Sequence, residues 1–193
     1  MRRKILVLVF IASISVQAKL SWSENYTFRY TRWGMTADEV IAAESKLDPI
    51  EKNENMIKYK TRVLGRNVEL IYSFVQNKLT GSSYIINENY LNSQHFITSY
   101  RILKEALTQK YGPAKVDQIN WRNDAFRNIS SKTGLALSLG HVDYLSSWDT
   151  PDTTISCSLK EDNYYVLCSI IYRSKEFSTL PPGSKKENEL DPL

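Results

Sequence analysis

The residues that most often carry out catalysis are few in this chain of 193 residues. The sequence has two histidines, His95 and His141, and two cysteines, Cys157 and Cys168. A hydrolase brings together a nucleophile, a base and an orienting group, and the base is most often a histidine. Neither histidine lies in a recognisable catalytic motif, so a structural role is favoured for both.

Carboxylates near the ends of predicted strands form the second group of candidates. They are Asp149, Asp152, Glu161 and Asp162. Two carboxylates held close together can act as acid and base, and His141 lies near them in the sequence. The same residue types are common in turns, and we favour that interpretation. An envelope hydrolase with a site near His141 is therefore the alternative to a non-enzymatic function.

Cofactor and metal sites have no recognisable signature in the sequence. Gly-rich phosphate loops, nucleophile elbows and zinc-protease helices are all absent from it. Two cysteines and two histidines provide no metal-ligand spacing, so we expect no structural zinc site. The sequence predicts no cofactor and no metal, and it favours a binding function over an enzymatic one.

The first residues have the order of a cleavable secretory signal. Basic residues 2–4 precede an apolar run over residues 5–16, and small residues occupy the positions that a signal peptidase reads. The run is much shorter than the roughly 20 apolar residues that a spanning helix needs. We expect cleavage between Ala18 and Lys19, a periplasmic or secreted protein, and no stable membrane insertion.

Most of the net positive charge belongs to this predicted signal. The formal net charge of the whole chain is +4, and residues 1–18 carry three positive charges and no negative ones, which leaves +1. Nucleic-acid binding usually requires a clustered basic face. A nearly neutral mature chain therefore gives no reason to expect a nucleic-acid partner.

The elements that must position any site follow a repeated order. A capping box of Thr36 and Glu39 predicts a helix over residues 36–47 that stops at Pro49. Alternating apolar and polar residues then predict three antiparallel strands. These strands cover residues 57–63, residues 68–74 and a segment ending near residue 86, with the aromatic residues Tyr59, Tyr72 and Phe74 in the core.

The second half of the chain has a similar pattern. Apolar residues at helical spacing predict a helix over residues 93–111, which the pair Gly112 and Pro113 ends. A strand over residues 116–121 and a short helix over residues 134–140 follow. Three further strands are expected at residues 144–148, 153–160 and 164–172.

These elements predict an α+β fold of two helix-plus-antiparallel-meander units packed as one domain. We expect a signal peptide over residues 1–18 and a domain over residues 19–174, with halves at about 28–90 and 91–174. Residues 175–193 combine turn formers and charges without an apolar pattern, which predicts a disordered tail.

The two cysteines fall in the last two predicted strands. A two-residue turn at residues 162–163 sets a register that places Cys157 opposite Cys168 on an apolar face. Directly opposed residues have Cα separations of about 4.5 to 5.5 Å, within the range that a disulfide spans. Export also favours the bond. We therefore predict a disulfide between Cys157 and Cys168, and the alternative is two buried free thiols.

Two motifs carry a resemblance to known proteins. The segment WGMTADEV at residues 33–40, followed by a strand pair and by KYGP at residues 110–113, resembles a group of exported bacterial proteins of unassigned function. More distantly, the helix-then-meander units are similar to the fold shared by BamE-type outer-membrane assembly lipoproteins and the β-lactamase inhibitor proteins. The chain departs from the first in having no lipid-accepting cysteine, and no residue matches a known inhibitory contact of the second.

The function that follows is an exported, non-enzymatic binding module that presents a sheet face or loops to another protein of the bacterial envelope. Among the aromatic residues, Trp22, Tyr26 and Trp33 precede the first predicted helix and are the better candidates for an exposed contact. A small-ligand carrier is a further alternative, and it would need an apolar cavity between helix and sheet.

Overall fold

The computed structural model describes residues 26–177. The predicted signal peptide and its cleavage site between Ala18 and Lys19 lie outside these residues, and so does the chain from residue 178 on. Three residues of the predicted tail are described. The Lys175 N–H donates to the Asp152 carbonyl oxygen at 2.9 Å, and the Phe177 ring is so close to Gly34 that an added Cβ would lie 3.0 Å from it. Lys175 and Phe177 therefore contact the domain.

Helix α1 (Ala37–Ala43) begins at the capping box that the sequence predicts. The Thr36 hydroxyl accepts a hydrogen bond from the Glu39 N–H, and the Glu39 carboxylate accepts one from the Thr36 N–H. The helix is shorter than predicted, because Glu44 already turns into the core. Strand β1 (Pro49–Lys52), which the sequence analysis did not predict, comes next.

The first half continues as a meander of β2 (Met56–Val63), β3 (Arg66–Val75) and β4 (Lys78–Ile86). Two-residue turns connect these strands at residues 64–65 and 76–77, and all four turn residues have positive φ angles. Positive φ at both central residues is the geometry of the type I′ hairpin turn, whose twist matches that of the flanking strands.

The second half follows the predicted order closely. Its elements are α2 (Gln94–Tyr111), β5 (Val116–Trp121), α3 (Thr133–Ser138), β6 (Val142–Asp149), β7 (Thr153–Asp162) and β8 (Tyr165–Ser174). Two short 3₁₀ turns lie between β5 and α3, at Asp124–Phe126 and Ser130–Lys132.

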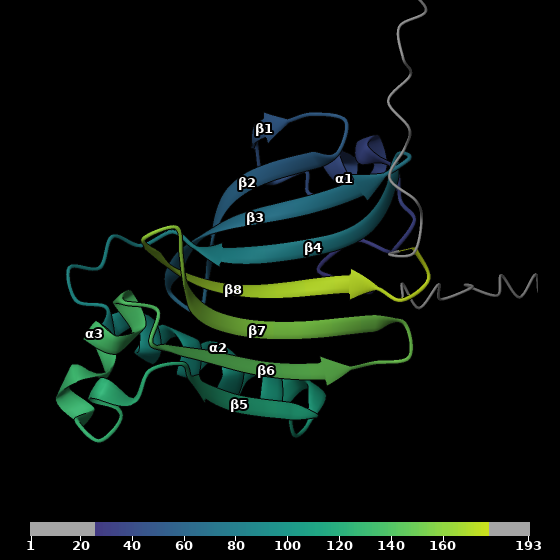
Figure 1. Ribbon diagram of the computed structural model, residues 1–193. Helices are drawn as coiled ribbons and strands as arrows, with labels where there is room; N and C mark the ends of the chain where they lie inside the picture. Colours follow the sequence, from purple (N-terminus) through teal and green to yellow (C-terminus); the bar gives the residue numbers. More distant parts are fainter. Residues whose placement is uncertain (1–25, 178–193) are drawn as a thin grey trace, which may run out of the picture.

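All the strands of the described residues form one antiparallel sheet in the order β1-β2-β3-β4-β8-β7-β6-β5 (Figure 1). Strands β4 and β8, which end the two predicted halves, pair at its centre. Helix α2 lies against β7 and β8 on one face, with α3 beside it. The predicted α+β class is confirmed, with more sheet than helix. The finer prediction of two similar packed units is not confirmed by this arrangement.

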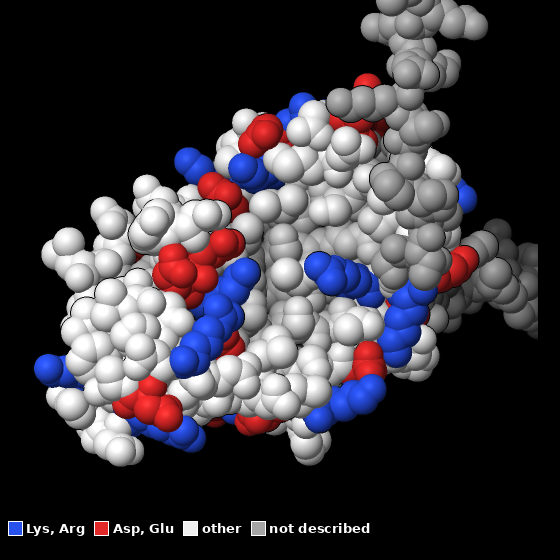
Figure 2. All heavy atoms as spheres, in the orientation of Figure 1, with Lys and Arg blue, Asp and Glu red and all other residues white. Residues whose placement is uncertain are grey.

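The core lies between the helices and the sheet face that they cover. Tyr59, Tyr72 and Phe74 are buried there, as predicted. The other sheet face is open and hollowed at its centre, with charged side chains gathered mainly around its rim (Figure 2). The hollow has a volume of about 550 Å³, and small residues such as Gly81 and Ser83 form much of its floor.

A largely buried ion pair joins the end of α1 to the segment before it, and Tyr72 links the pair to the sheet. The Glu44 carboxylate, 2% exposed as a residue, accepts two hydrogen bonds from the Arg29 guanidinium, at 2.6 and 2.9 Å. The Tyr72 hydroxyl donates to the same carboxylate. Burial, and then the hydrogen bond to Glu44, raise the pKa of Tyr72 well above its usual range. This phenol therefore stays a donor to Glu44 across the physiological pH range.

The register of β7 and β8 differs from the predicted one. Cys157 lies opposite Ile170 and Cys168 lies opposite Leu159, so the predicted pairing of the two cysteines is wrong. The reason is the position of the turn, which occupies Asn163 and Tyr164, one residue later than expected. A turn displaced by one residue moves every cross-strand partner by two and leaves each side chain on the same face.

The two cysteines are accordingly diagonal neighbours on the buried face. Diagonal neighbours are about 7 to 8 Å apart, beyond the usual Cα separation of a disulfide. Cys157 and Cys168 are free buried thiols in this structure, which corresponds to the alternative and not to the predicted disulfide.

Candidate functional site

The hairpin of β7 and β8 projects beyond the neighbouring strand of the sheet. Pairing of β4 with β8 ends at Ile85 and Ser169, whereas pairing of β7 with β8 continues to Asp162 and Tyr165. The last turn of the hairpin therefore has no strand beside it on the β4 side. We call residues 163–165, at the end of this projection, the tyrosine tip.

The tyrosine tip is a type I′ turn with an unfavourable residue. Asn163 has φ 51° and Tyr164 has φ 69°, both in the left-handed region. Asparagine tolerates this region, but for a bulky residue such as tyrosine it is an outlier. The Glu161 carboxylate stabilises the turn by accepting a hydrogen bond from the Tyr164 N–H. This hydrogen bond holds the turn in place, although the left-handed backbone is unfavourable for its second residue, Tyr164.

The other two type I′ turns have residues that tolerate the left-handed region at the second central position. The second central residue is Gly65 between β2 and β3, and Asn77 between β3 and β4. Glycine has no penalty in the left-handed region, and asparagine has a small one. Tyr164 is the one aromatic residue with a positive φ angle among the described residues. The local backbone therefore gives no reason for a tyrosine at position 164.

Packing gives no reason for it either. Tyr164 is 98% exposed and Tyr165 is 78% exposed. Within the part of the chain that the structure describes, neither ring pairs with another aromatic ring or a cation. A side chain exposed to this extent contributes little to folding, so the packing of the Tyr164 ring does not offset the strain of its backbone, which the Glu161 hydrogen bond holds in place.

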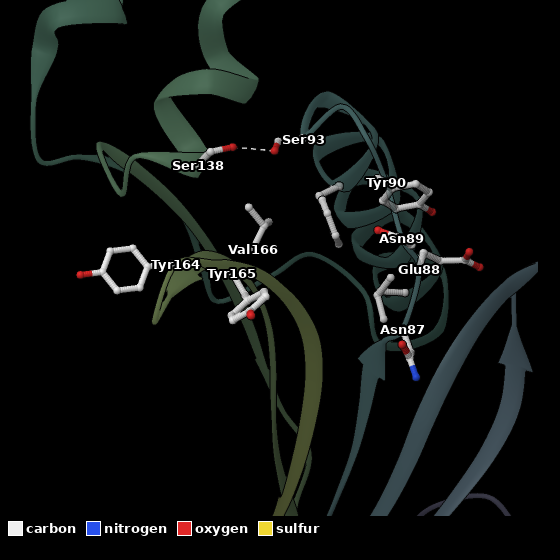
Figure 3. Close-up of a pocket in the computed structure, with 11 residues that line it drawn as sticks. Asn87, Glu88, Asn89, Tyr90, Ser93, Ser138, Tyr164, Tyr165 and Val166 are labelled. Carbon is white, nitrogen blue, oxygen red and sulfur yellow. Dashed lines mark hydrogen bonds between the residues drawn. The ribbon is translucent and has the colours of Figure 1, made fainter.

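A small cavity lies next to the tyrosine tip, between the start of β8, the loop before α2 and the end of α3. Its volume is about 280 Å³. Figure 3 shows Tyr90 and Asn89 on one side and Tyr165 with Val166 on the other. Tyr164 is also part of the lining, although its ring is directed outward. The lining combines aromatic rings with amide, hydroxyl and carboxylate groups.

A hydrogen bond closes one side of this cavity. The hydroxyl oxygens of Ser93, before α2, and Ser138, at the end of α3, lie 2.5 Å apart (Figure 3). Gly134 allows the two helices to meet here, because a Cβ at that position would lie 2.8 Å from the Gln94 nitrogen. The helices thus form a fixed wall against which the hairpin projects.

Several exposed aliphatic residues lie at the same end of the sheet as the tip. Leu64 is in the turn between β2 and β3, and Leu91 is in the loop before α2. Leu135 and Leu139 are exposed on and after α3. Uncharged side chains cover much of this end of the molecule, on the left in Figure 2. Exposed apolar and aromatic residues gathered at one end indicate a contact surface.

The sequence-predicted catalytic candidates come together only in part. The Glu161 carboxylate lies near His141, since a Cβ on the adjacent Gly140 would lie 3.2 Å from Glu161 Oε2, but no hydrogen bond joins the two side chains among the described residues. The His141 ring stacks on Phe126, with centroids 5.7 Å apart, and its buried Nδ1 has no hydrogen-bond partner among the described residues. Asp149 pairs with Lys115 at the far end of β6, and Asp152 accepts hydrogen bonds within its own turn. A strand of that length separates its ends by about 25 Å. The carboxylates at its far end are therefore remote from His141.

The remaining candidates have structural surroundings. His95 lies beside the Tyr90 ring, with centroids 5.6 Å apart. The Trp33 indole donates to the Thr153 hydroxyl at 2.8 Å, which accounts for its position. Tyr26 is exposed and meets Tyr30 edge-on, whereas Trp22 lies outside the described residues. Over residues 26–177, no group of three His, Cys, Asp or Glu side chains could hold a metal ion.

The cavities do not match a carrier of apolar ligands, because both described above open at the surface and have polar groups in their walls. Within the described residues, no helix has the length and apolar character needed to cross a membrane. Comparisons of the chain with protein-family models, with curated proteins and with solved structures find no match to any of them.

Sequence reasoning missed the tyrosine tip because it placed the turn one residue too early. With Tyr164 assigned to a strand, its left-handed backbone could not be foreseen. One signal was present: two adjacent tyrosines directly after Asp162 and Asn163, in a hairpin without the glycine that type I′ turns prefer.

Proposed function

We propose that this protein is a non-enzymatic binding module of the bacterial envelope that contacts another protein through the tyrosine tip. The observation that carries the proposal is Tyr164, which adopts φ 69° while 98% exposed. Strained residues are held by the structure around them and cluster at functional sites. Contact with a partner is the function that an exposed tyrosine ring can perform.

A protein partner fits this end of the molecule better than a small ligand does. Tyrosine is enriched among the residues that dominate binding energy at protein interfaces, since it offers a large rigid surface and a hydroxyl at low entropic cost. Tyr164 points outward from a projecting turn, and several leucines at the same end of the sheet are exposed. A small molecule would need a concave site around the ring.

The scaffold supports presentation of such a tip. Strands β1 to β4 and β8 to β5 are two runs of four neighbours that meet at the pair β4 and β8. We regard them as two similar units, as the order of elements in the sequence suggests. The extracytoplasmic location rests on the N-terminal sequence pattern. The hydrolase alternative is less well supported, because Glu161 lies near His141 but accepts a hydrogen bond from the Tyr164 N–H, while the buried Nδ1 of His141 has no partner among the described residues.

Photo-crosslinking in the producing cell tests the proposal. A photoreactive phenylalanine analogue at Tyr164 or Tyr165 should form an adduct with one envelope protein. The matched control is the same analogue at Ile50, an exposed apolar residue on the edge strand β1, away from the β7 and β8 hairpin. Equal adducts at all three positions, or none at the tip, would contradict the proposed contact. A cytoplasmic protein in the adduct would contradict the location.

A further inference from the structure

The two edges of the sheet are protected to different degrees. Edge strand β1 has four residues, begins with Pro49 and has an irregular register between Pro49 and Glu51. Proline, bulges and short length are the features by which proteins prevent pairing at an edge. Edge strand β5 has six residues in continuous register with β6, and it contains neither proline nor lysine. The β5 edge therefore lacks these protections.

The backbone of β5 has one set of outward-facing groups. The Arg122 N–H donates to the His141 carbonyl oxygen at 2.7 Å, which continues the ladder between β5 and β6. Residues two apart point the same way in an antiparallel pair, so the even-numbered residues of β5 face β6. The N–H and C=O groups of Asp117, Ile119 and Trp121 face outward. No other strand of the described residues pairs with them.

We infer that this edge pairs with the same edge of a second copy of the chain. Two antiparallel copies of one strand are related by a two-fold axis, and the outward residues of β5 are centred on Ile119. An axis at Ile119 places each Ile119 opposite the other, and Asp117 opposite Trp121 of the second copy. All the outward-facing groups of both strands then find hydrogen-bond partners. The result is one sheet that runs continuously through both molecules.

The side chains agree with a second copy as the occupant. Ile119 is 59% exposed, and pairing about the axis buries the two isoleucines against each other. Asp117 brings no free charge, because its carboxylate already accepts a hydrogen bond from Lys104 at 2.5 Å. Gln118 comes opposite Asn120 of the second copy, so amide side chains meet amides. No like charges oppose each other within the paired strands.

The contact is small, since it consists mainly of one six-residue strand from each molecule. Interfaces below the standard size are weak, so we expect a dissociation constant of about micromolar or higher. Sedimentation equilibrium of the purified protein should show a reversible monomer and dimer that depend on protein concentration. A monomer at every accessible concentration overturns the inference.

Charged substitutions at the axis test the register. Ile119→Arg and Ile119→Asp each place like charges opposite one another, and each should weaken the dimer at least about 10-fold. A mixture of the two variants should restore a heterodimer, because unlike charges then meet at the axis. The control Ile119→Val keeps the dimer. The exposed position should leave the melting temperature of each variant near that of the wild type.

Two outcomes contradict the pairing. A dimer that Ile119→Arg does not weaken forms through another surface. Failure of the mixed variants to form a heterodimer, when each alone is monomeric, excludes a two-fold axis at Ile119.

Discussion

At the scale of single residues, the two most unusual environments have different explanations. Glu44 and Arg29 form a largely buried ion pair whose carboxylate also accepts the Tyr72 hydroxyl, so every oxygen and charge is satisfied within the fold. Tyr164 has the opposite character, because its backbone is strained and its ring has no partner among residues 26–177. The first environment stabilises the domain, and the second is available to a partner.

The ion pair gives a prediction about stability. Glu44→Gln removes the charge while keeping the volume, and it leaves Arg29 largely buried without a counter-ion. Breaking a fully buried pair costs about 3 to 5 kcal/mol. Because the Arg29 side chain is partly exposed, we expect a loss of about 2 to 3 kcal/mol in the free energy of unfolding, measured by denaturant titration.

The control for this substitution is a surface pair. Asp38 and Lys52 form an exposed ion pair at 3.4 Å, so Asp38→Asn should change the free energy of unfolding by less than about 1 kcal/mol. Equal losses for the two variants would show that the Glu44 pair contributes nothing beyond a surface interaction.

At the scale of elements, the extent of each pattern decided how well the sequence predicted it. The helix over residues 94–111 has long, regular apolar spacing and lies where expected. The capping box fixed the start of α1, but the periodicity did not reveal that Glu44 turns inward to meet Arg29. Arg29 lies outside the helical segment, so the spacing of apolar residues within the helix does not indicate this contact.

The β7 and β8 hairpin shows why register is harder to predict than strand position. Two registers, offset by two residues, both keep the apolar residues on one face, since strand side chains alternate with a period of two. The choice between them depends on the turn. Without a glycine in residues 161–165, the sequence does not distinguish the two turns. Side-chain patterning thus defined the buried face, and the turn defined the partners.

The observed register predicts free cysteines. Unfolded, non-reduced protein should contain two alkylatable thiols, whereas the folded protein should react slowly at neutral pH. Burial raises the pKa of the Cys168 thiol from 9.0 to about 12, and it raises the pKa of Cys157 further. Mass spectrometry after alkylation with and without denaturant measures both. Cysteines that react only after reduction would contradict this prediction and support a disulfide between Cys157 and Cys168.

The same shifts set the pH dependence of stability. A raised folded-state pKa favours the neutral thiol, so this contribution is complete below the ordinary thiol value near 9.0. It is lost as the pH rises from there through the folded-state pKa. We therefore expect the unfolding free energy to fall above about pH 9, and replacement of both cysteines by alanine should reduce the slope.

At the scale of the whole molecule, a helix-backed sheet holds a strained turn at one end. The core, the ion pair and the hydrogen bond between Ser93 and Ser138 all fix the scaffold behind the tyrosine tip. The fold class could be read from the sequence, because patterning controls it. The candidate site could not, since its signal is the left-handed backbone of one exposed residue, which depends on the hairpin register.

The central claim is that Tyr164 serves binding at the expense of folding. Tyr164→Gly removes a left-handed penalty of about 1 to 2 kcal/mol. The added flexibility of glycine in the unfolded chain offsets roughly half of this gain. We therefore expect a net stabilisation of about 0.5 to 1 kcal/mol. The control Asn163→Gly relieves little strain and keeps the tyrosine, so it should leave both stability and binding nearly unchanged.

The most direct test measures the free energy of unfolding and the affinity for the crosslinked partner on the same Tyr164→Gly protein. We predict that the variant is more stable than the wild type and binds at least about 10-fold more weakly, as loss of an interface tyrosine would cause. Asn163→Gly should bind as the wild type does. A Tyr164→Gly variant that is stabilised yet retains full affinity would contradict the account.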